Sequence, residues 1–467
     1  MSSPKVVVIG AGSHFFGRSV VWNTAHSEIL RKGTLALVDT NQRVLETMVE
    51  LAGRVVREVD SPLIVTGSTD RRELLRDADF VVLSFCDRNM HFRKIDTEVA
   101  KKHGITLCSA DTVGPAGVFR ALREIPVVLA IASEVNELAP NAWIINYVNP
   151  TATVGIALMR NTEARSIAIC DSLREPMLRL NLLKGAGILG EQAARIPPEI
   201  EARLVMRIGG VNHFTWMTEF SYDGRDMLPI IHEKLVEKAA RERSSLASFD
   251  SDLTINDKSK ARLNENYRLE LIDVFGAVPQ CISHSKEYVP FFQGYGIAPV
   301  KPEALIPFDA EARVKQMEEQ WAETEDYALG RKPIQEFLAT GQSELATDII
   351  ESMWGNLGKS FFINTKNNGA VSNMADDAFL ELRCHLDMHG PRPQFFGEMP
   401  RGILGMQQLI LDTHELIATA AVQYDRGLLL RAMATDPLVN NIEDARHIIE
   451  EQFKRQKDAL PGAWYKS

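Results

Sequence analysis

The chain has 467 residues, of which 45% are hydrophobic and 24% are charged, and its net charge is −10. This composition is typical of a soluble globular protein, and the length exceeds one compact core, so two fused parts are expected. The negative charge argues against nucleic-acid and membrane-surface partners, which need basic fields. The five cysteines form no close pairs, and neither a signal peptide nor a membrane-spanning run stands out. We therefore expect a cytoplasmic protein without disulfides.

Residues 5–17, KVVVIGAGSHFFG, predict a buried strand that turns directly into a helix. Gly10 and Gly12 allow a tight turn that ends at Ser13, and such a turn brings backbone N–H groups to a pyrophosphate at a helix N-terminus. The third glycine of the usual G-x-G-x-x-G pattern comes two residues late, at Gly17. The turn is therefore a candidate dinucleotide-binding site.

A second apolar strand, residues 35–38, ends in Asp39, a little over twenty residues past the turn. A carboxylate at this point accepts both ribose hydroxyls of NAD and repels the 2′-phosphate of NADP. Strand, turn, helix, strand and acid follow one another in the required order. This order favours NAD binding over a glycine-rich turn that binds nothing.

Strands alternate with helical segments through the first part of the chain. The alternation predicts a doubly wound parallel sheet of Rossmann-like type over residues 1–195, with ligands beyond the carboxyl ends of its strands. Residues 196–467 are expected to form an α+β domain for substrate, metal and oligomerisation, an arrangement like that of malate and lactate dehydrogenases. Further strands are expected at 64–65, 80–85, 143–148 and 166–169, and a strand followed by a turn at 205–216. A charged irregular piece is expected at 86–102, a turn at 111–117, a helix from 119 and extended structure at 219–231. Helices are expected within 232–275, 305–360 and 400–460.

Cys170 and His213 are candidate metal ligands. Cys170 follows the predicted strand 166–169 at the carboxyl edge of the sheet, and His213 follows Gly-Gly-Val-Asn. A thiolate and an imidazole together bind a borderline divalent cation and leave open positions for two substrate oxygens. A cysteine and a histidine this far apart are more often plain core residues. The position beside a nucleotide fold favours the metal site.

A series of motifs extends over nearly the whole chain. The motifs are GAGS (10–13), DTVGPAGVFRALREIP (111–126), NYVNPTATV (146–154), AICDS (168–172), GGVNHFTW (209–216), RLELIDVFG (268–276), HSKEYVPFF (284–292), NTKNNGAVSN (364–373) and AAVQYDRGLLLRAMATDPLV (420–439). In identity and order they resemble glycoside hydrolase family 4, the NAD- and divalent-metal-dependent glycosidases, or a sister family such as the NAD-dependent sulfoquinovosidases.

The resemblance implies an unusual route to hydrolysis. NAD⁺ removes a hydride from sugar C3, and a divalent metal, expected to be Mn²⁺, holds the C2 and C3 oxygens and polarises the new carbonyl. A base then removes the acidified C2 proton, and the C1–O bond breaks by elimination. Water adds to the double bond and NADH returns the hydride, so no net oxidation occurs.

The resemblance also implies roles for single residues. Cys170 and His213 match the family's metal ligands, and His213 is also expected beside the sugar. Asp171 matches an aspartate thought to protonate the leaving group in some α-specific members; alternatively it caps the following helix. The base at C2 is Glu270, which matches an acidic position of the neutral-sugar and uronide branches, or Tyr267, since some members use a tyrosine.

Further residues are expected to hold substrate and cofactor. Asn149 and Asn212 hydrogen-bond sugar hydroxyls or the nicotinamide ribose in this interpretation. Asp111 and Arg120 flank the predicted Gly-Pro-Ala-Gly turn and orient the sugar or a metal-bound water; alternatively Asp111 only forms the turn. Arg93 is expected to contact either the NAD pyrophosphate or the sugar C6 group.

The substrate is expected to be an α-glycoside with an anionic C6 group. The DTVGPAG motif is closest to the uronidase branch, and Arg88, His91, Arg93 and Lys94 offer charge-assisted hydrogen bonds to a carboxylate or sulfonate. The group is then that of a uronide or a sulfoquinovoside, and a neutral hexoside stays an alternative. In the alternative interpretation, these basic residues are solvated or contact the NAD pyrophosphate.

Two other function classes compete with the glycosidase. A net dehydrogenase of a hydroxy acid or sugar would share the N-terminal half, but such enzymes use a His–Asp pair and an arginine clamp instead of a Cys–His pair. An NAD-responsive binding protein would leave the polar strand ends unexplained. The C-terminal helices further predict a homodimer or homotetramer.

Overall fold

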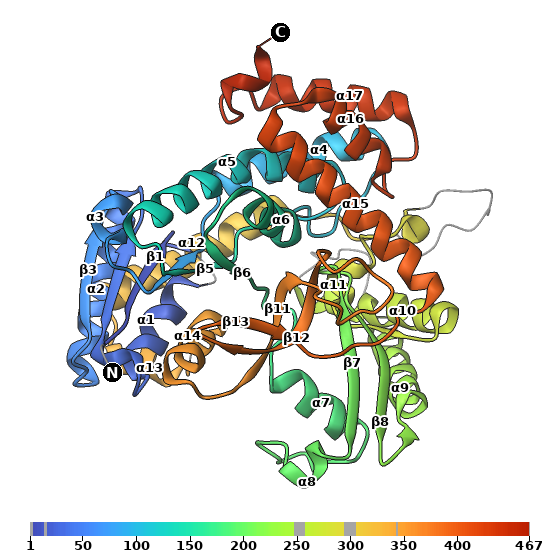
Figure 1. Cartoon of the computed structure of the whole chain (residues 1–467), viewed down its shortest axis with the longest axis horizontal. Coiled ribbons are helices and arrows are strands. Elements are labelled where there is room, and N and C mark those ends of the chain that lie inside the picture. The colour runs from blue at the N-terminus through green and yellow to red at the C-terminus, as the bar shows by residue number, and fades with distance from the viewer. Residues whose placement is uncertain (1–2, 14–15, 247–256, 294–304, 342–343, 467) are drawn as a thin grey trace.

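One mixed sheet of thirteen strands runs through both parts of the chain (Figure 1). The computed structural model describes residues 3–13, 16–246, 257–293, 305–341 and 344–466. The strands are β1 (Lys5–Ile9), β2 (Thr34–Val38), β3 (Ile64–Ser68), β4 (Phe80–Leu83), β5 (Trp143–Asn146), β6 (Arg165–Ala168), β7 (Leu204–Gly210), β8 (Trp216–Tyr222), β9 (Arg225–Asp226), β10 (Val278–Pro279), β11 (Ser360–Lys366), β12 (Phe379–Asp387) and β13 (Gly390–Pro393).

Helices cover this sheet and make up most of the chain after residue 400. They are α1 (Gly17–His26), α2 (Gln42–Glu58), α3 (Arg71–Leu75), α4 (Asn89–Lys102), α5 (Gly114–Leu138), α6 (Thr151–Asn161), α7 (Met177–Gly185), α8 (Pro198–Glu201), α9 (Leu228–Leu246), α10 (Asp257–Phe275), α11 (Ile282–Ser285), α12 (Ala310–Ala328), α13 (Ile334–Ala339), α14 (Leu345–Gly355), α15 (Arg401–Gln423), α16 (Arg426–Thr435) and α17 (Ile442–Arg455), with 3₁₀ turns at Leu30–Lys32, Pro290–Phe292 and Gly462–Tyr465. Within the described residues, no helix is both long and apolar enough to span a membrane.

The N-terminal half of the sheet is parallel, as predicted. Its strand order is β3-β2-β1-β4-β5-β6, and every neighbouring pair runs in the same direction. This is the order of a dinucleotide-binding fold, in which successive strands are added on one side of β1 and then, from β4, on the other side, which leaves a crevice between β1 and β4. β4 and β5 end two residues before the predicted limits, so the polar residues that follow lie beyond the strand ends.

Three local predictions were wrong. Residues 89–102, expected to be irregular, form α4, because buried side chains recur at 92, 95, 96, 99 and 100 and face α5. The Gly-Pro-Ala-Gly segment, expected to be a turn before the helix, is the first turn of α5. Proline is tolerated there because its missing N–H has no helical partner. The extended stretch predicted to reach residue 231 ends earlier, where α9 begins at Leu228.

The C-terminal part continues the same sheet with antiparallel strands. β11 pairs with β6 through Asn364 and Ala168, and β12, β7, β8 and β10 follow outward. The strands β11 to β13 were not predicted. Helices α15 and α17 pack back on α5, α6 and α4 (Figure 1), so C-terminal residues cover the N-terminal half of the sheet. The division at residue 195 stays a prediction.

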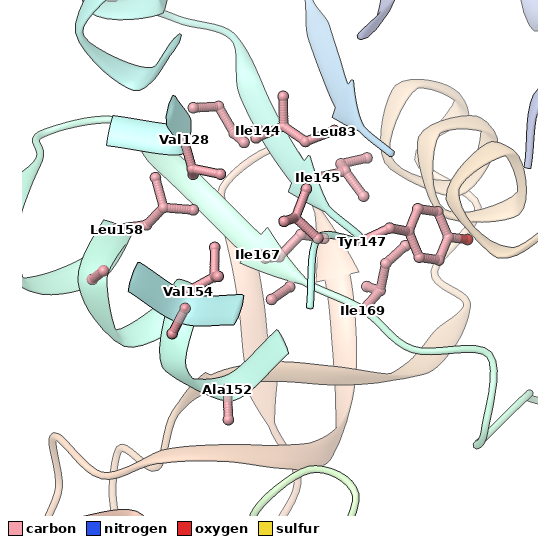
Figure 2. Close-up of a cluster of buried hydrophobic side chains, with 14 of the residues drawn as sticks. Leu83, Val128, Ile144, Ile145, Tyr147, Ala152, Val154, Leu158, Ile167 and Ile169 are labelled. Carbon is pink, nitrogen blue, oxygen red and sulfur yellow. The ribbon is translucent and has the colours of Figure 1, made fainter. Parts of the chain in front are cut away.

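A continuous apolar core holds the parallel strands to their covering helices. Figure 2 shows strand residues such as Ile144, Ile145 and Ile167 in one buried cluster with Val128 of α5 and Val154 of α6. All five side chains are at most 1% exposed. Close packing of this kind means that a lost methyl group leaves a void that neighbours fill only in part.

Ile145 tests this core. Ile145→Ala should destabilise the fold by roughly 2–5 kcal/mol, because the deletion removes buried area and leaves a cavity. The matched control is Val127→Ala on α5, whose side chain is 42% exposed. Thermal melting followed by circular dichroism should show a clear fall in Tm for the first variant and almost none for the second; equal Tm values would contradict the packing described.

Candidate functional site

The turn after β1 is built by close backbone contacts. Gly10 has φ +93°, and a Cβ there would lie 2.3 Å from the Ser84 carbonyl oxygen. A Cβ on Gly17 would lie 2.2 Å from the Ala11 carbonyl oxygen, at the start of α1. Gly17 therefore performs the packing role of the third glycine in the usual pattern, which explains why a glycine two residues late is compatible with the same turn.

Asp39 lies at the end of β2 and is joined to this turn. Its Oδ2 accepts the N–H of Gly12 at 3.0 Å, and its Oδ1 accepts the N–H of Asn41 at 3.0 Å. The Ser13 N–H donates to the Gly10 carbonyl, at 3.0 Å, and closes the turn. The predicted elements of a dinucleotide site are thus adjacent, with a half-buried carboxylate beside the glycine turn.

Cys170 and His213 meet directly beyond the end of β6. Cys170 Sγ lies 3.2 Å from His213 Nδ1, although the two residues are 43 positions apart. Two residues that were not predicted join them: Cys281, which precedes α11, and His284 on its single turn. One ligand atom from each of His213, Cys281 and His284 lies within 4.8 Å of the others. The C-x-x-H spacing of Cys281 and His284 is a signal in the sequence that could have pointed to this pair.

His213 is held by hydrogen bonds to its backbone. Its N–H donates to the Tyr288 hydroxyl at 2.9 Å, and that hydroxyl donates to the Asn212 carbonyl at 2.9 Å, across a cis Asn212–His213 peptide. The Ser285 hydroxyl donates to the His213 carbonyl at 3.2 Å. Because these backbone groups are satisfied, the imidazole is free to face Cys170 and His284, whose ring stacks on it at 4.2 Å.

The two thiols of the cluster differ in acidity. Burial raises the pKa of the Cys170 thiol well above its usual range, and Glu381 and Cys281 add to the effect. Burial acts in the same direction on Cys281, but contacts with His213 and Ser283 outweigh it and lower its pKa. The two thiols and the imidazoles of His213 and His284 are ligand types that bind a borderline transition metal.

Buried polar groups without good partners lie beside the cluster. Glu381 on β12 is fully buried, and burial raises its pKa to about 7, although His213 and the Asn212 amide favour the charged form. Within the described residues, neither its carboxyl oxygens nor the amide of Asn364 on β11 make a hydrogen bond of good geometry. Polar groups buried in this way need a partner, so the site fits a polar ligand or cation.

A second cluster surrounds Asp111 in front of α5. Asp111 Oδ2 lies 3.3 Å from Arg93 Nη2, 3.7 Å from Arg120 Nη1 and 3.4 Å from Asn149 Nδ2. Burial disfavours the Asp111 carboxylate, but the two arginines outweigh it, with help from His284 and His213, and hold its pKa well below the usual range. The structure therefore brings together four predicted residues and sets them close to the thiol–imidazole cluster.

The two candidate bases lie three residues apart on α10 but differ in environment. Tyr267 is 4% exposed, packs edge-on against Phe292 and lies under Lys286, whose Nζ is 5.2 Å from its ring centre. The neighbouring Glu287 accepts two backbone N–H groups just before Asp111, which links this region to the second cluster. Glu270 is exposed and makes no hydrogen bond or ion pair with the described residues.

Asp171, the predicted acid, follows Cys170 at the rim of the site. Its side chain keeps 44% exposure and lies 3.6 Å from Arg174. Desolvation by the surrounding protein raises the pKa of Asp171 to about 6, with Arg174 opposing and Glu344 adding to the rise. The alternative role as a helix cap is not seen, because the next helix, α7, begins at Met177 with Pro176 as its cap.

The basic run at 88–94 does not act as a unit. Arg88, which precedes α4, is paired with Asp87 and Asp458, and Lys94 on the exposed face of α4 is paired with Glu311. Arg93 alone turns inward, donates to the Ser109 carbonyl and covers the Phe308 ring. His91 is exposed and stacks edge-on with Phe92.

Comparison with known proteins identifies the family. The profile of the "Family 4 glycosyl hydrolase" matches residues 5–180, and that of the "Family 4 glycosyl hydrolase C-terminal domain" matches residues 208–439. The chain therefore belongs to the family 4 glycosyl hydrolases, a group of NAD-dependent glycosidases. The predicted family and enzyme class are confirmed.

Relatives in the family act on different sugars. The chain is 29% identical to an α-galactosidase of Bacillus subtilis, over 98% of this chain and 99% of that protein. It is 25% identical to an α-galacturonidase of Lachnoclostridium phytofermentans, over 99% of this chain and 98% of that protein. The differing substrates of these relatives leave the sugar to be determined.

Solved structures confirm the predicted fold class. A 6-phospho-α-glucosidase from gut microorganisms, solved with NAD and Mn²⁺, superposes with a TM-score of 0.75 at 20% identity, over 98% of this chain and 99% of that one. It thus contains both of the predicted cofactors. The malate dehydrogenase of Cryptosporidium parvum superposes with a TM-score of 0.50 at 10% identity, over 90% of this chain and all of that one.

Asp111 offers a test of the second cluster. Asp111→Ala should destabilise the fold by roughly 3–5 kcal/mol, because it removes the carboxylate with which two buried guanidinium groups form ion pairs. The control is Asp87→Ala, which removes an exposed partner of Arg88 and should cost at most about 1 kcal/mol. Denaturant unfolding of both variants measures the difference; similar midpoints would show that Asp111 does not balance these arginines.

Proposed function

We propose that this chain hydrolyses an α-glycoside by transient oxidation at sugar C3, with NAD and a divalent cation as cofactors. The observation that carries the proposal is the 3.2 Å contact between Cys170 Sγ and His213 Nδ1 beyond the end of β6. This contact places a thiol and an imidazole, which are common metal ligands, at the carboxyl edge of a dinucleotide-binding sheet. The mechanism of a hydroxy-acid dehydrogenase, which uses a His–Asp pair and an arginine clamp, has no role for a thiol at this position.

The cofactors would be held by separate parts of the site. The turn of Gly10, Gly12 and Ser13 would receive the NAD pyrophosphate, and Asp39 its ribose hydroxyls. Cys170 and His213 would hold the cation. When bound, NAD⁺ takes up and returns the C3 hydride, and the cation polarises the C3 carbonyl.

Tyr267 is the residue that we assign as the base at sugar C2. It is buried beside the cationic Lys286, which stabilises a phenolate. Glu270, the other candidate, is exposed, and among the described residues no group makes a hydrogen bond or ion pair that would orient it. In this assignment the Tyr267 hydroxyl oxygen takes the C2 proton, and the burial of the ring excludes competing water.

Asp171 is the residue that we assign as the acid for the leaving group. With its pKa near 6, a sizeable fraction of the carboxyl is protonated in mildly acidic solution. The proton passes from its carboxyl to the oxygen at C1 as that bond breaks. The partial exposure of Asp171 at the rim gives room for an aglycone.

Sugar binding is the role that we assign to Asn149, Asn212, Asp111 and Arg120. Arg93 would contact the group at sugar C6. The guanidinium groups of Arg93 and Arg120 lie against the carboxylate of Asp111 in this cluster and could also donate charge-assisted hydrogen bonds to an anionic group. A carboxylate or sulfonate at C6 would use these donors, whereas the exposed and paired Arg88 and Lys94 take no part. The proposed substrate is accordingly a uronide or sulfoquinovoside, with a neutral hexoside as the alternative.

A panel of 4-nitrophenyl glycosides tests the proposed function. It should contain α- and β-glucosides, galactosides, glucuronides and sulfoquinovosides, each assayed with and without NAD⁺, Mn²⁺ and EDTA. We expect that nitrophenol is released from an α-glycoside only when NAD⁺ is present. NADH should not accumulate during this release. Steady formation of NADH without cleavage would instead identify a net dehydrogenase.

The assignment of the base makes a separate prediction. Tyr267→Phe keeps the ring contacts but should lower kcat by about 100-fold or more, the usual contribution of a general base. Glu270→Gln, three residues along the same helix, should keep nearly full activity. Single-turnover absorbance should also show that Tyr267→Phe still forms NADH, because oxidation at C3 precedes the blocked step. Loss of activity in Glu270→Gln alone would reverse the assignment.

A further inference from the structure

A second thiol–imidazole pair lies against the first. Cys281 Sγ is 3.0 Å from His284 Nδ1, and both residues offer ligand atoms within 4.8 Å of one on His213. His213 in turn contacts Cys170 through its Nδ1. One thiol and two imidazoles thus lie within 4.8 Å of one another, and the thiol of Cys170 reaches this group through its contact with His213.

The second pair is fixed in position by its own short helix. The Cys281 carbonyl accepts the N–H of Ser285 at 2.8 Å and that of His284 at 3.0 Å. The Ser285 hydroxyl is bonded to the His213 carbonyl, so this helix is tied to the backbone of the residue that it faces. Cys281 and His213 are 6% and 2% exposed, respectively. A preformed, water-poor set of donors of this kind is the arrangement that a metal site requires.

The donor types also restrict the cation. Thiolates are soft ligands that select zinc and iron, whereas Mn²⁺ prefers carboxylate, carbonyl and water oxygens. A site with one thiolate and one imidazole leaves most positions to oxygen ligands and suits Mn²⁺. A second thiolate and a second imidazole shift the preference toward Zn²⁺, Fe²⁺ and Co²⁺.

We propose that Cys281 and His284 are cation ligands together with Cys170 and His213, and that the site therefore prefers a borderline cation such as Zn²⁺ or Co²⁺ to Mn²⁺. The proposal rests on the proposed function, because it concerns the same cation. Cations of this kind expand from four ligands to five, which leaves a place for a substrate oxygen.

Cobalt binding to the metal-free full-length chain tests the proposal without an activity assay. Thiolate ligands give Co²⁺ an intense charge-transfer absorption. Cys281→Ser and Cys170→Ser should each lower this absorption per bound cobalt by about half, because one of two thiolates is lost. The control is Cys384→Ser, which changes a fully buried thiol on β12 whose pKa reflects burial alone, and it should keep the full absorption.

Competition between cations gives a second readout. Cys281→Ser and His284→Gln should each raise the Kd for Zn²⁺ by about 100-fold or more, since loss of even an outer partner of a ligand costs roughly 10–100-fold. The same variants should bind Mn²⁺ almost as tightly as the unchanged chain. Thermal melts establish that each variant is folded, and His284→Gln carries the test if Cys281→Ser is not.

The outcomes separate the two proposals. Unchanged cobalt spectra and zinc affinity in both Cys281→Ser and His284→Gln, with a change in Cys170→Ser, would overturn the extended ligand set and leave the proposed function intact. A wild-type chain that binds none of Co²⁺, Zn²⁺ and Mn²⁺ would overturn both.

Discussion

The pairing of β11 with the edge of β6 is the constraint on which the site depends. Asn364 and Ala168 are the paired residues, two positions before Cys170 along β6. Through this pairing, the antiparallel strands of the C-terminal part continue the parallel sheet of the N-terminal part. The thiol at the end of β6 is thereby placed beside residues from β11, β12 and the segment after β7. Without this pairing, β6 would be an open edge strand, and Cys170 would lack its partners.

The segment between β7 and β8 delivers His213 because two features hold it. Gly210 has φ +140°, and a Cβ there would lie 2.7 Å from Gln407 Nε2, so no side chain fits. Gln407 on α15 accepts the Val211 N–H and donates to the Phe214 carbonyl, each at 2.6 Å. A buried amide from the last part of the chain thus brackets the turn that carries His213. This explains the Gly-Gly-Val-Asn-His-Phe motif in physical terms.

Periodicity and strand-end polarity allowed the N-terminal half to be predicted from sequence. The buried strands before Gly10 and Asp39 and the helices between them have strong apolar patterns, which depend on few distant contacts. The contact between Cys170 and His213 was also predicted, because strand ends of one sheet converge and the motifs resemble a known family. The strands β11 to β13 were missed, since their pairing with β6 and β7 is long-range and their flanking Asn- and Gly-rich segment gives no clear strand signal.

The direction of side chains on helices decides between site residues that the sequence could not separate. Arg88, His91, Arg93 and Lys94 were treated as one basic loop, but on α4 the helical period directs Arg93 inward and Lys94 outward. Arg88 precedes the helix and is exposed. From the sequence Glu270 was the first choice for the base and Tyr267 the second, and only the packing of α10 buries Tyr267 and exposes Glu270. Cys281 and His284 lie at a four-residue helix, too short for any periodic pattern, so their part in the cluster emerged only from the fold.

The elimination route is the central claim, and the fate of the C2 hydrogen tests it most directly. The reaction should be run in D₂O with NAD⁺ and the cation, and the released sugar examined by NMR and mass spectrometry. The account predicts deuterium at C2 of the product, because the C2 proton leaves before water adds, and none at C3, because that hydride is returned. Hydrolysis that yields a sugar without deuterium at C2 would contradict the account and indicate direct displacement at C1.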